Sequence, residues 1–289
     1  MNKYYAVIVA VATAMSVGST ATAGTMIQNK GSDTLVNVAQ SLAEEYQKIK
    51  PEVAIAVTGG GSGTGIAAMI NGTVDIANSS RIIEEKEIKM AAKNNIHPRE
   101  LVIGYDALGV FVHKSNPLNE ITLANLARMY GDGGDLNNWK QLGVEVPGCK
   151  GQKIILISRQ NNSGTYEYFR EAVLHKKDFI MGTRDMHGSK DVVDLVGKTP
   201  CAIGYSGMAY ADQSSKMLNI KKDDSSPAVA PSMESAVNKT YPIARPLFMY
   251  TNGEPTGEIK TYLDWVMSQQ GQCLVSKKGY APAKPVACK

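Results

Sequence analysis

Three polar segments of the chain combine the residue types that bind a small anion. They are residues 31–34 (GSDT), 61–65 (GSGTG) and 162–165 (NSGT), and each comes directly before a segment with helical spacing. The first turn of a helix leaves N–H groups unpaired and carries about half a positive charge, and neighbouring Ser and Thr hydroxyls add donors. Arg159, four residues before Ser163, would add a full charge and a planar fork of donors. Facing one ligand, the three segments would roughly balance a dianion. Taken singly, each could be only a helix cap.

Common nucleotide and hydrolase motifs do not fit these segments. A P-loop needs Gly-Lys-Ser/Thr, but Gly65 is followed by Ile66, and residues 59–65 hold no strict G-x-G-x-x-G. The hydrolase motif G-x-S-x-G is absent around Ser62 and Ser206. The four histidines are scattered, with none at i, i+4 from another, so we expect no metal and no cofactor. The sequence therefore favours binding over catalysis.

Alternating strands and helices must position these segments. Apolar residues recur at helical spacing over 35–49, Pro51 ends that pattern, and a β-branched alternation follows at 53–57. Further helices are predicted at 66–70, 84–94, 123–130, 166–174 and 257–268, and further strands at 74–77, 101–103, 110–113, 154–157, 202–205 and 247–250. This alternation predicts an α/β fold with mainly parallel sheets.

The composition is typical of a soluble, exported protein. Of 289 residues, 43% are hydrophobic and 20% charged, the formal net charge is +4, and no run of Lys or Arg exceeds two, which argues against a nucleic-acid partner. Lys3, an apolar run at 4–15 and the triplet Ala21-Thr22-Ala23 indicate a secretory signal peptide over residues 1–23. We expect cleavage after Ala23, because the run is too short to span a bilayer and no Cys follows to accept a lipid.

The four cysteines indicate disulfides, because their number is even and the chain is exported. Four cysteines allow three pairings. We favour Cys273–Cys288 as a short C-terminal loop with Cys149–Cys201 as the second bridge, and buried free thiols are the alternative.

Several runs of the sequence resemble one known family. They are GSDTL (31–35), GGGSGTG (59–65), TVDIANSSR (73–81), YDALGVFVHKSNPL (105–118), ISRQNNSGT (157–165) and CAIGYSGMAY (201–210). In this order they resemble the periplasmic phosphate-binding proteins of the high-affinity phosphate ABC importer (PstS-like) over essentially the whole mature chain. The resemblance implies a two-lobed periplasmic-binding-protein fold (type II-like) with two hinge crossovers and a central ligand cleft. It also implies delivery of phosphate to a membrane permease and no chemistry on the ligand.

The same resemblance implies which residues bind the ligand. Thr34 would supply a hydroxyl and a backbone donor, Leu35 a backbone N–H, Ser62 a hydroxyl, and Arg159 the charged fork. The complete set carried over is Thr34, Leu35, Ser62, Ser80, Arg81, Arg159, Ser163, Gly164 and Thr165.

Two positions depart from the pattern of the best-known members. Ser80 stands where a carboxylate would accept a phosphate proton, and Asn161 stands where an acid would pair with the arginine. Arg81 is an extra cation whose alternative role is a surface or lobe–lobe salt bridge. The remaining candidate acceptors are Asp33, Asp75 and Asp106, and a solvated or capping role is the alternative for each.

The expected lobes are residues 24–107 plus 247–289 and residues 108–246, with the crossovers near 106–109 and 245–247. The sequence thus predicts a monomeric periplasmic receptor that captures inorganic phosphate for an ABC importer and is not an enzyme. A receptor for another tetrahedral oxyanion (sulfate, molybdate or tungstate) is the first alternative. An exported phosphohydrolase, or a phosphate-sensing or adhesion module, is the second.

Overall fold

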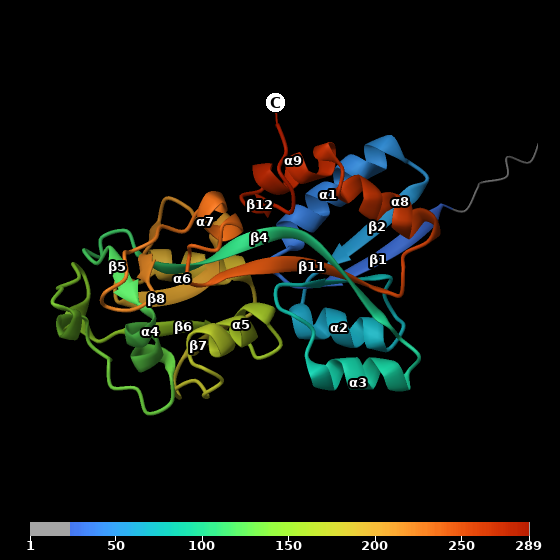
Figure 1. Cartoon of the computed structure of the whole chain (residues 1–289). Helices are drawn as coiled ribbons and strands as arrows, with labels where there is room; N and C mark the ends of the chain where they lie inside the picture. The colour runs from blue at the N-terminus through green and yellow to red at the C-terminus, as the bar shows by residue number, and fades with distance from the viewer. Residues whose placement is uncertain (1–23, 289) are drawn as a thin grey trace, which may run out of the picture.

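The structure is a computed structural model that describes residues 24–288. Strands and helices alternate along the chain and build one curled, mixed sheet of ten strands in the order β2-β1-β3-β11-β4-β8-β6-β7, with β9 and β12 paired to β4 (Figure 1). The expected signal peptide and its cleavage site lie outside the described residues. No helix within residues 24–288 is long and apolar enough to cross a membrane.

Two lobes share this sheet. Lobe 1 is built on β1 (Thr25–Gly31), β2 (Val53–Thr58) and β3 (Ile76–Ser79), with α1 (Val36–Ile49), α2 (Ser62–Ile70), α3 (Glu85–Lys93), α8 (Gly257–Val266), α9 (Gln269–Lys277) and β12 (Ala281–Pro282). Lobe 2 is built on β6 (Ile155–Arg159), β7 (Arg184–Met186) and β8 (Ala202–Gly207), with α4 (Leu123–Tyr130), α5 (Gly164–Ala172), α6 (Ser189–Lys198), α7 (Met233–Val237) and the short strands β5 (Glu120–Thr122), β9 (Ser215–Met217) and β10 (Asn219–Lys221). The predicted two-lobed α/β fold is confirmed. The expectation of mainly parallel sheets was wrong, because the central strands of this sheet pair antiparallel with their neighbours.

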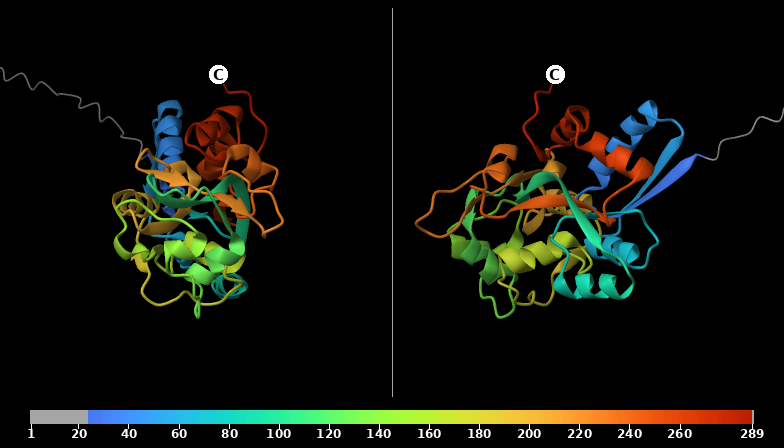
Figure 2. Two further views of the ribbon diagram at one scale, coloured as in Figure 1. Left: turned by 90° about the vertical axis from the view of Figure 1, so that its left-hand side faces the viewer. Right: turned by 45° about the vertical axis from the view of Figure 1, so that its right-hand side comes forward.

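Helices cover both faces of each lobe's sheet. In lobe 1, α1, α8 and α9 lie on one side of β1 and β2, and α2 and α3 lie on the other (Figures 1 and 2). Helix α1 turns Val38, Leu42 and Tyr46 into the core, and all three are buried because they recur on one face of the helix. In lobe 2 the main core gathers around Tyr130, Phe169 and the other buried apolar residues between α4, α5 and β8.

Two long strands connect the lobes. β4 (Pro98–His113) and β11 (Ala244–Asn252) run antiparallel side by side, and β4 continues from its pairing with β11 into its pairing with β8 (Figure 1). The sequence predicts two strands here, at 101–103 and 110–113. That expectation was wrong because the backbone ladder does not stop at the polar residue Asp106, which pairs in register with Arg245. The predicted lobe boundaries, at 107/108 and 246/247, fall inside these strands and stay a prediction.

Other element boundaries also differ from the predicted ones. α2 begins at Ser62, so the segment 62–65 is the first turn of the helix and not a loop before it. The expected last helix over 257–268 ends at Val266, and a further helix, α9, follows after the capping residue Ser268, whose hydroxyl accepts from Gly271 N at 3.3 Å. β1 and α6 were not predicted.

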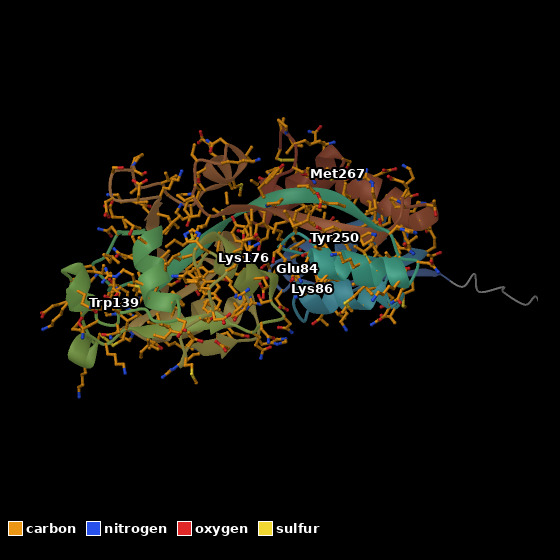
Figure 3. All side chains as sticks on the ribbon, turned by 60° about the horizontal axis from the view of Figure 1, so that its bottom comes forward. Glu84, Lys86, Trp139, Lys176, Tyr250 and Met267 are labelled. Atoms are coloured by element: carbon orange, nitrogen blue, oxygen red, sulfur yellow. A yellow bond between two sulfur atoms is a disulfide. The ribbon has the colours of Figure 1, made fainter. Side chains whose placement is uncertain are left out.

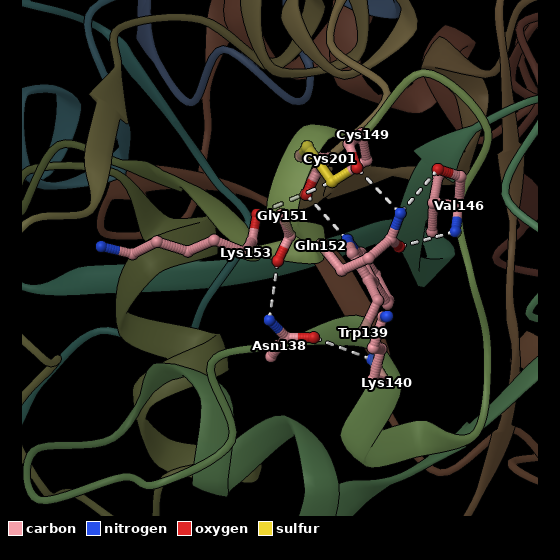
Figure 4. The surroundings of a disulfide bond; sticks show 9 residues. All are labelled: Asn138, Trp139, Lys140, Val146, Cys149, Gly151, Gln152, Lys153 and Cys201. Carbon is pink, nitrogen blue, oxygen red and sulfur yellow. Dashed lines mark hydrogen bonds between the residues drawn. A yellow bond between two sulfur atoms is a disulfide. The ribbon is translucent and has the colours of Figure 1, made fainter.

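Both favoured disulfides are present: Cys149–Cys201 and Cys273–Cys288. The first joins two loops of lobe 2 beside Trp139, whose indole N–H donates to Cys201 O at 3.1 Å (Figure 4). Gln152 holds the neighbouring loop, since its Nε2 donates to Cys149 O at 2.8 Å and to Val146 O at 3.1 Å. Trp139 is fully buried.

Candidate functional site

The three predicted anion-binding segments meet where the lobes touch. Thr34, before α1 in lobe 1, and Thr165, in the first turn of α5 in lobe 2, place their hydroxyl oxygens 3.0 Å apart. Gly164 lies so close to Ser62 and Ser80 that a Cβ at this glycine would overlap Ser62 Oγ and lie 2.8 Å from Ser80 Oγ. All five residues are buried. Residues 131 positions apart in the chain thus form one site.

The backbones of the two lobes also meet at Asn162, in the loop before α5. Asn162 O accepts from Gly63 N at 3.0 Å, and Asn162 Nδ2 donates to Gly60 O at 3.0 Å. Gly61 has φ +89°, and a Cβ there would lie 2.5 Å from Asn162 O, so this approach needs glycine. The lobes are therefore in direct contact along the first turn of α2.

The guanidinium of Arg159 is almost fully buried, and its charge is paired across the lobes. Nη2 lies 3.0 Å from Asp33 Oδ2 in lobe 1 and donates to His187 O at 2.8 Å, while Nη1 donates to Ser189 Oγ at 3.0 Å. Burial lowers the pKa of Arg159, and Asp33 opposes that shift. Asn161, which stands where an acid would pair with the arginine in the best-known family members, is exposed. The carboxylate partner comes instead from the opposite lobe.

Ser80 belongs to a cluster of three buried serines. Ser32 Oγ donates to Ser80 Oγ at 2.9 Å, and Ser80 N donates to Ser62 Oγ at 3.0 Å. Ser62 Oγ and Ser80 Oγ lie 3.4 Å apart. The backbone N–H expected as a donor at Leu35 already donates to Ser32 O at 3.0 Å, because it closes the turn that leads into α1.

Arg81 lies beside this cluster with its charge satisfied inside lobe 1. Its Nη1 and Nη2 donate to the two carboxylate oxygens of Glu87, at 2.8 and 2.7 Å, and Nη2 lies 3.5 Å from Glu84. A surface pocket next to it is lined from both lobes, with Glu84 and Lys176 among the lining residues on the face shown in Figure 3. Arg81 thus forms a buried salt bridge within lobe 1, and not the surface or lobe–lobe bridge that was its alternative role, while its role at the ligand stays a prediction.

Arg245 also lies at Thr34 and Thr165, although it is not among the site residues predicted from the sequence. Its Nε and Nη2 lie 3.0 and 2.8 Å from Asp106 Oδ2, Nη1 lies 3.1 Å from Thr165 Oγ1, and Nη2 lies 3.4 Å from Thr34 Oγ1. The side chains of Arg245 and Asp106 are both 0% exposed. Burial raises the pKa of Asp106, and Arg245 opposes that shift. A signal was present, because an arginine inside the otherwise apolar strand 244–250 needs a buried partner.

The site favours an anion although its side chains carry no large excess of positive charge. Arg159 is balanced by Asp33, and Arg245 by Asp106. The N-termini of α1, α2 and α5 add about half a positive charge each. The third candidate acceptor, Asp75, lies apart and accepts from Gln28 N at 2.7 Å. The arrangement therefore offers mainly donors to a ligand.

The sequence and the fold both match known binding proteins. The PBP superfamily domain matches residues 16–270 of this chain. Phosphate-binding protein PstS of Pseudomonas aeruginosa is 33% identical over 267 residues, which cover 89% of this chain and 82% of that protein. Protein SphX of Synechococcus elongatus is 32% identical over 268 residues, 89% of this chain and 77% of that protein.

Two solved structures share the fold at low sequence identity. One is a substrate-binding protein of a phosphate ABC transporter from Clostridium perfringens, with bound phosphate, at 28% identity and a TM-score of 0.78 over 90% of this chain and 100% of that one. The other is an ABC-type phosphate transport receptor from Vibrio cholerae, at 26% identity and a TM-score of 0.69 over 90% and 100% of the two chains. The chain therefore belongs to the PBP superfamily and, within it, to the family of PstS phosphate-binding proteins.

Proposed function

We propose that this protein captures inorganic phosphate between its lobes and delivers it to the membrane permease of an ABC importer. The observation that carries the proposal is the convergence of three helix N-termini and of hydroxyls from both lobes on one buried place. Relatives named phosphate-binding protein, and a similar structure that holds phosphate, support the same ligand. The protein works after export as a monomer, cleaved after Ala23, and needs neither a metal nor a cofactor.

Phosphate oxygens would accept from the hydroxyls of both lobes and from helix N–H groups. Removing a dianion from water costs several kcal/mol unless nearly every oxygen gains a donor, so the lobes must close around it. The proposed ligand residues are Thr34, Ser62, Ser80, Arg159, Ser163, Gly164 and Thr165. Leu35 would contribute to phosphate binding through the position of its backbone. Arg81 would contribute through the electrostatic field of its positive charge. Closure would bend β4 and β11 near the predicted boundaries.

Calorimetry on the mature chain, freed of bound ligand by unfolding and refolding, tests this function. We expect one phosphate per chain and a decrease in the radius of gyration on binding, measured by small-angle scattering. A native mass spectrum of the protein as purified identifies any ligand that it carries. No heat with phosphate, or turnover of a chromogenic phosphate ester, would overturn the proposal, and turnover would favour the phosphohydrolase.

One observation favours a second ligand class, the other tetrahedral oxyanions. Asp33 and Asp106 each pair with an arginine, and by the family resemblance Ser80 stands where an acid would accept a phosphate proton. A carboxylate rejects sulfate by repulsion, whereas a hydroxyl can rotate and donate. Competition calorimetry with sulfate, molybdate and tungstate separates the two classes, since a phosphate receptor must bind phosphate more tightly than each competitor.

A further inference from the structure

The Arg245–Asp106 ion pair lies on the two strands that connect the lobes. The two residues are directly opposite in the antiparallel ladder of β11 and β4, so the backbone register fixes their separation. Their position therefore does not depend on either lobe alone.

Asp106 uses both carboxylate oxygens inside the protein. Oδ2 accepts from Nε and Nη2 of Arg245, and Oδ1 accepts from Met208 N at 3.0 Å. A buried guanidinium needs such a partner, because an unpaired charge in the interior is strongly destabilising. Asp106 thus holds Arg245 in one orientation.

The rest of the guanidinium faces the site. Nη1 donates to Thr165 Oγ1 at 3.1 Å and to Ser80 O at 3.3 Å, and Nη2 donates to Thr34 Oγ1 at 3.4 Å. Its carbon also lies 5.5 Å from the ring centre of Tyr168, in lobe 2. Arg245 therefore touches residues of both lobes from a strand between them.

These contacts decide where two hydroxyl protons can point. A guanidinium only donates, so Thr34 Oγ1 and Thr165 Oγ1 must accept from it. Each hydroxyl has one proton. One of the two protons can lie between the oxygens, which are 3.0 Å apart, and the other is left to donate outward. The charge of Arg245 makes both hydroxyls stronger donors.

We propose that Arg245, held by Asp106, is a positioning residue of the anion site: it directs one hydroxyl proton of the Thr34–Thr165 pair toward the ligand and links the two lobes in the closed arrangement. This inference rests on the proposed function, because it assigns a role in binding the same anion. It adds Arg245, which is not among the site residues predicted from the sequence, and gives the candidate acceptor Asp106 a role through Arg245.

A double variant tests the inference without leaving a buried charge unpaired. Arg245→Gln combined with Asp106→Asn removes both charges and leaves two polar amide side chains. We expect a folded protein, checked by circular dichroism, whose Kd for phosphate rises about tenfold or more, since hydroxyls lose a charged partner. If this variant fails to fold, Arg245→Lys keeps the ion pair but not the fork and should show the same loss of affinity.

The distinguishing readout is coupling to the threonine. The double replacement raises Kd by some factor in wild type. In a Thr165→Val background that factor should be at least about threefold smaller, because the hydroxyl that Arg245 directs is gone. In a matched Ser62→Ala background, whose lost hydroxyl does not contact Arg245, the full effect should remain. Equal effects in all three backgrounds, or an unchanged Kd in a folded double variant, would overturn the inference. Failure of wild-type protein to bind phosphate would instead overturn the proposed function.

Discussion

Gly164→Ala should prevent closure of the lobes while leaving each lobe folded. The new methyl group would overlap Ser62 Oγ and lie 2.8 Å from Ser80 Oγ, against 3.4 Å for an ordinary contact, so the lobes must separate by about 0.6 Å or more. Gly164 is the first residue of α5, where alanine is at least as favourable as glycine, so helix formation does not oppose the change. The backbone N–H of residue 164 is retained.

The size of the effect follows from the bonds between the lobes. A separation of about 0.6 Å stretches the 3.0 Å contacts Thr34–Thr165 and Arg159–Asp33 beyond hydrogen-bond range. Losing one neutral and one charge-assisted bond costs about 3 kcal/mol, or about 100-fold in Kd for phosphate.

Calorimetry measures this loss, and small-angle scattering with saturating phosphate should show a larger radius of gyration than wild type. Gly63→Ala is the matched control, because it also faces the other lobe from a helix, but its Cβ would lie 3.2 Å from Asn162 O and needs only a small adjustment. We expect a much smaller loss there. If Gly164→Ala binds phosphate within threefold of wild type, the two lobes do not close on this contact and the reasoning is wrong.

Three further perturbations test the site and the fold. Arg159→Ala should weaken phosphate binding by at least about 2 kcal/mol, about 30-fold, because the anion loses a charge-assisted partner, and unchanged affinity in calorimetry would remove this residue from the site. Replacing Cys273 and Cys288 by serine should lower the free energy of unfolding by about 3 kcal/mol in urea titrations, since the bridge closes a 15-residue separation, and an unchanged midpoint would contradict that estimate. Sulfate in about 1000-fold excess should displace phosphate from wild type by competition calorimetry, and Ser80→Asp should suppress this effect; no displacement from wild type would show that another group rejects sulfate.

Local patterns in the sequence determined much of the fold and the parts of the site. Helical spacing predicted α1, α3 and α4 nearly to the residue, because an apolar stripe along a helix is a local feature. The segments before α1 and α5 were identified in the same way, since Ser, Thr and Gly at a helix start have a local physical meaning. The sequence also carried an even set of cysteines, which indicated disulfides, and the short spacing of Cys273 and Cys288 favoured one of the three pairings.

Tertiary structure alone decided which groups face one another. Asp33 pairs with Arg159 from 126 positions away, and Asp106 pairs with Arg245 from 139 positions away. No local pattern encodes either distance, because both depend on how the lobes and β4 and β11 come together. The partner of each arginine is also decided by the fold. Nothing local in the sequence distinguishes Arg81 from Arg159, but in the folded chain Arg81 pairs with a carboxylate of its own lobe and Arg159 with a carboxylate of the other lobe. Because Arg159 and Arg245 are buried, the folded state depends on these pairings, since an unpaired charge in the interior is strongly destabilising.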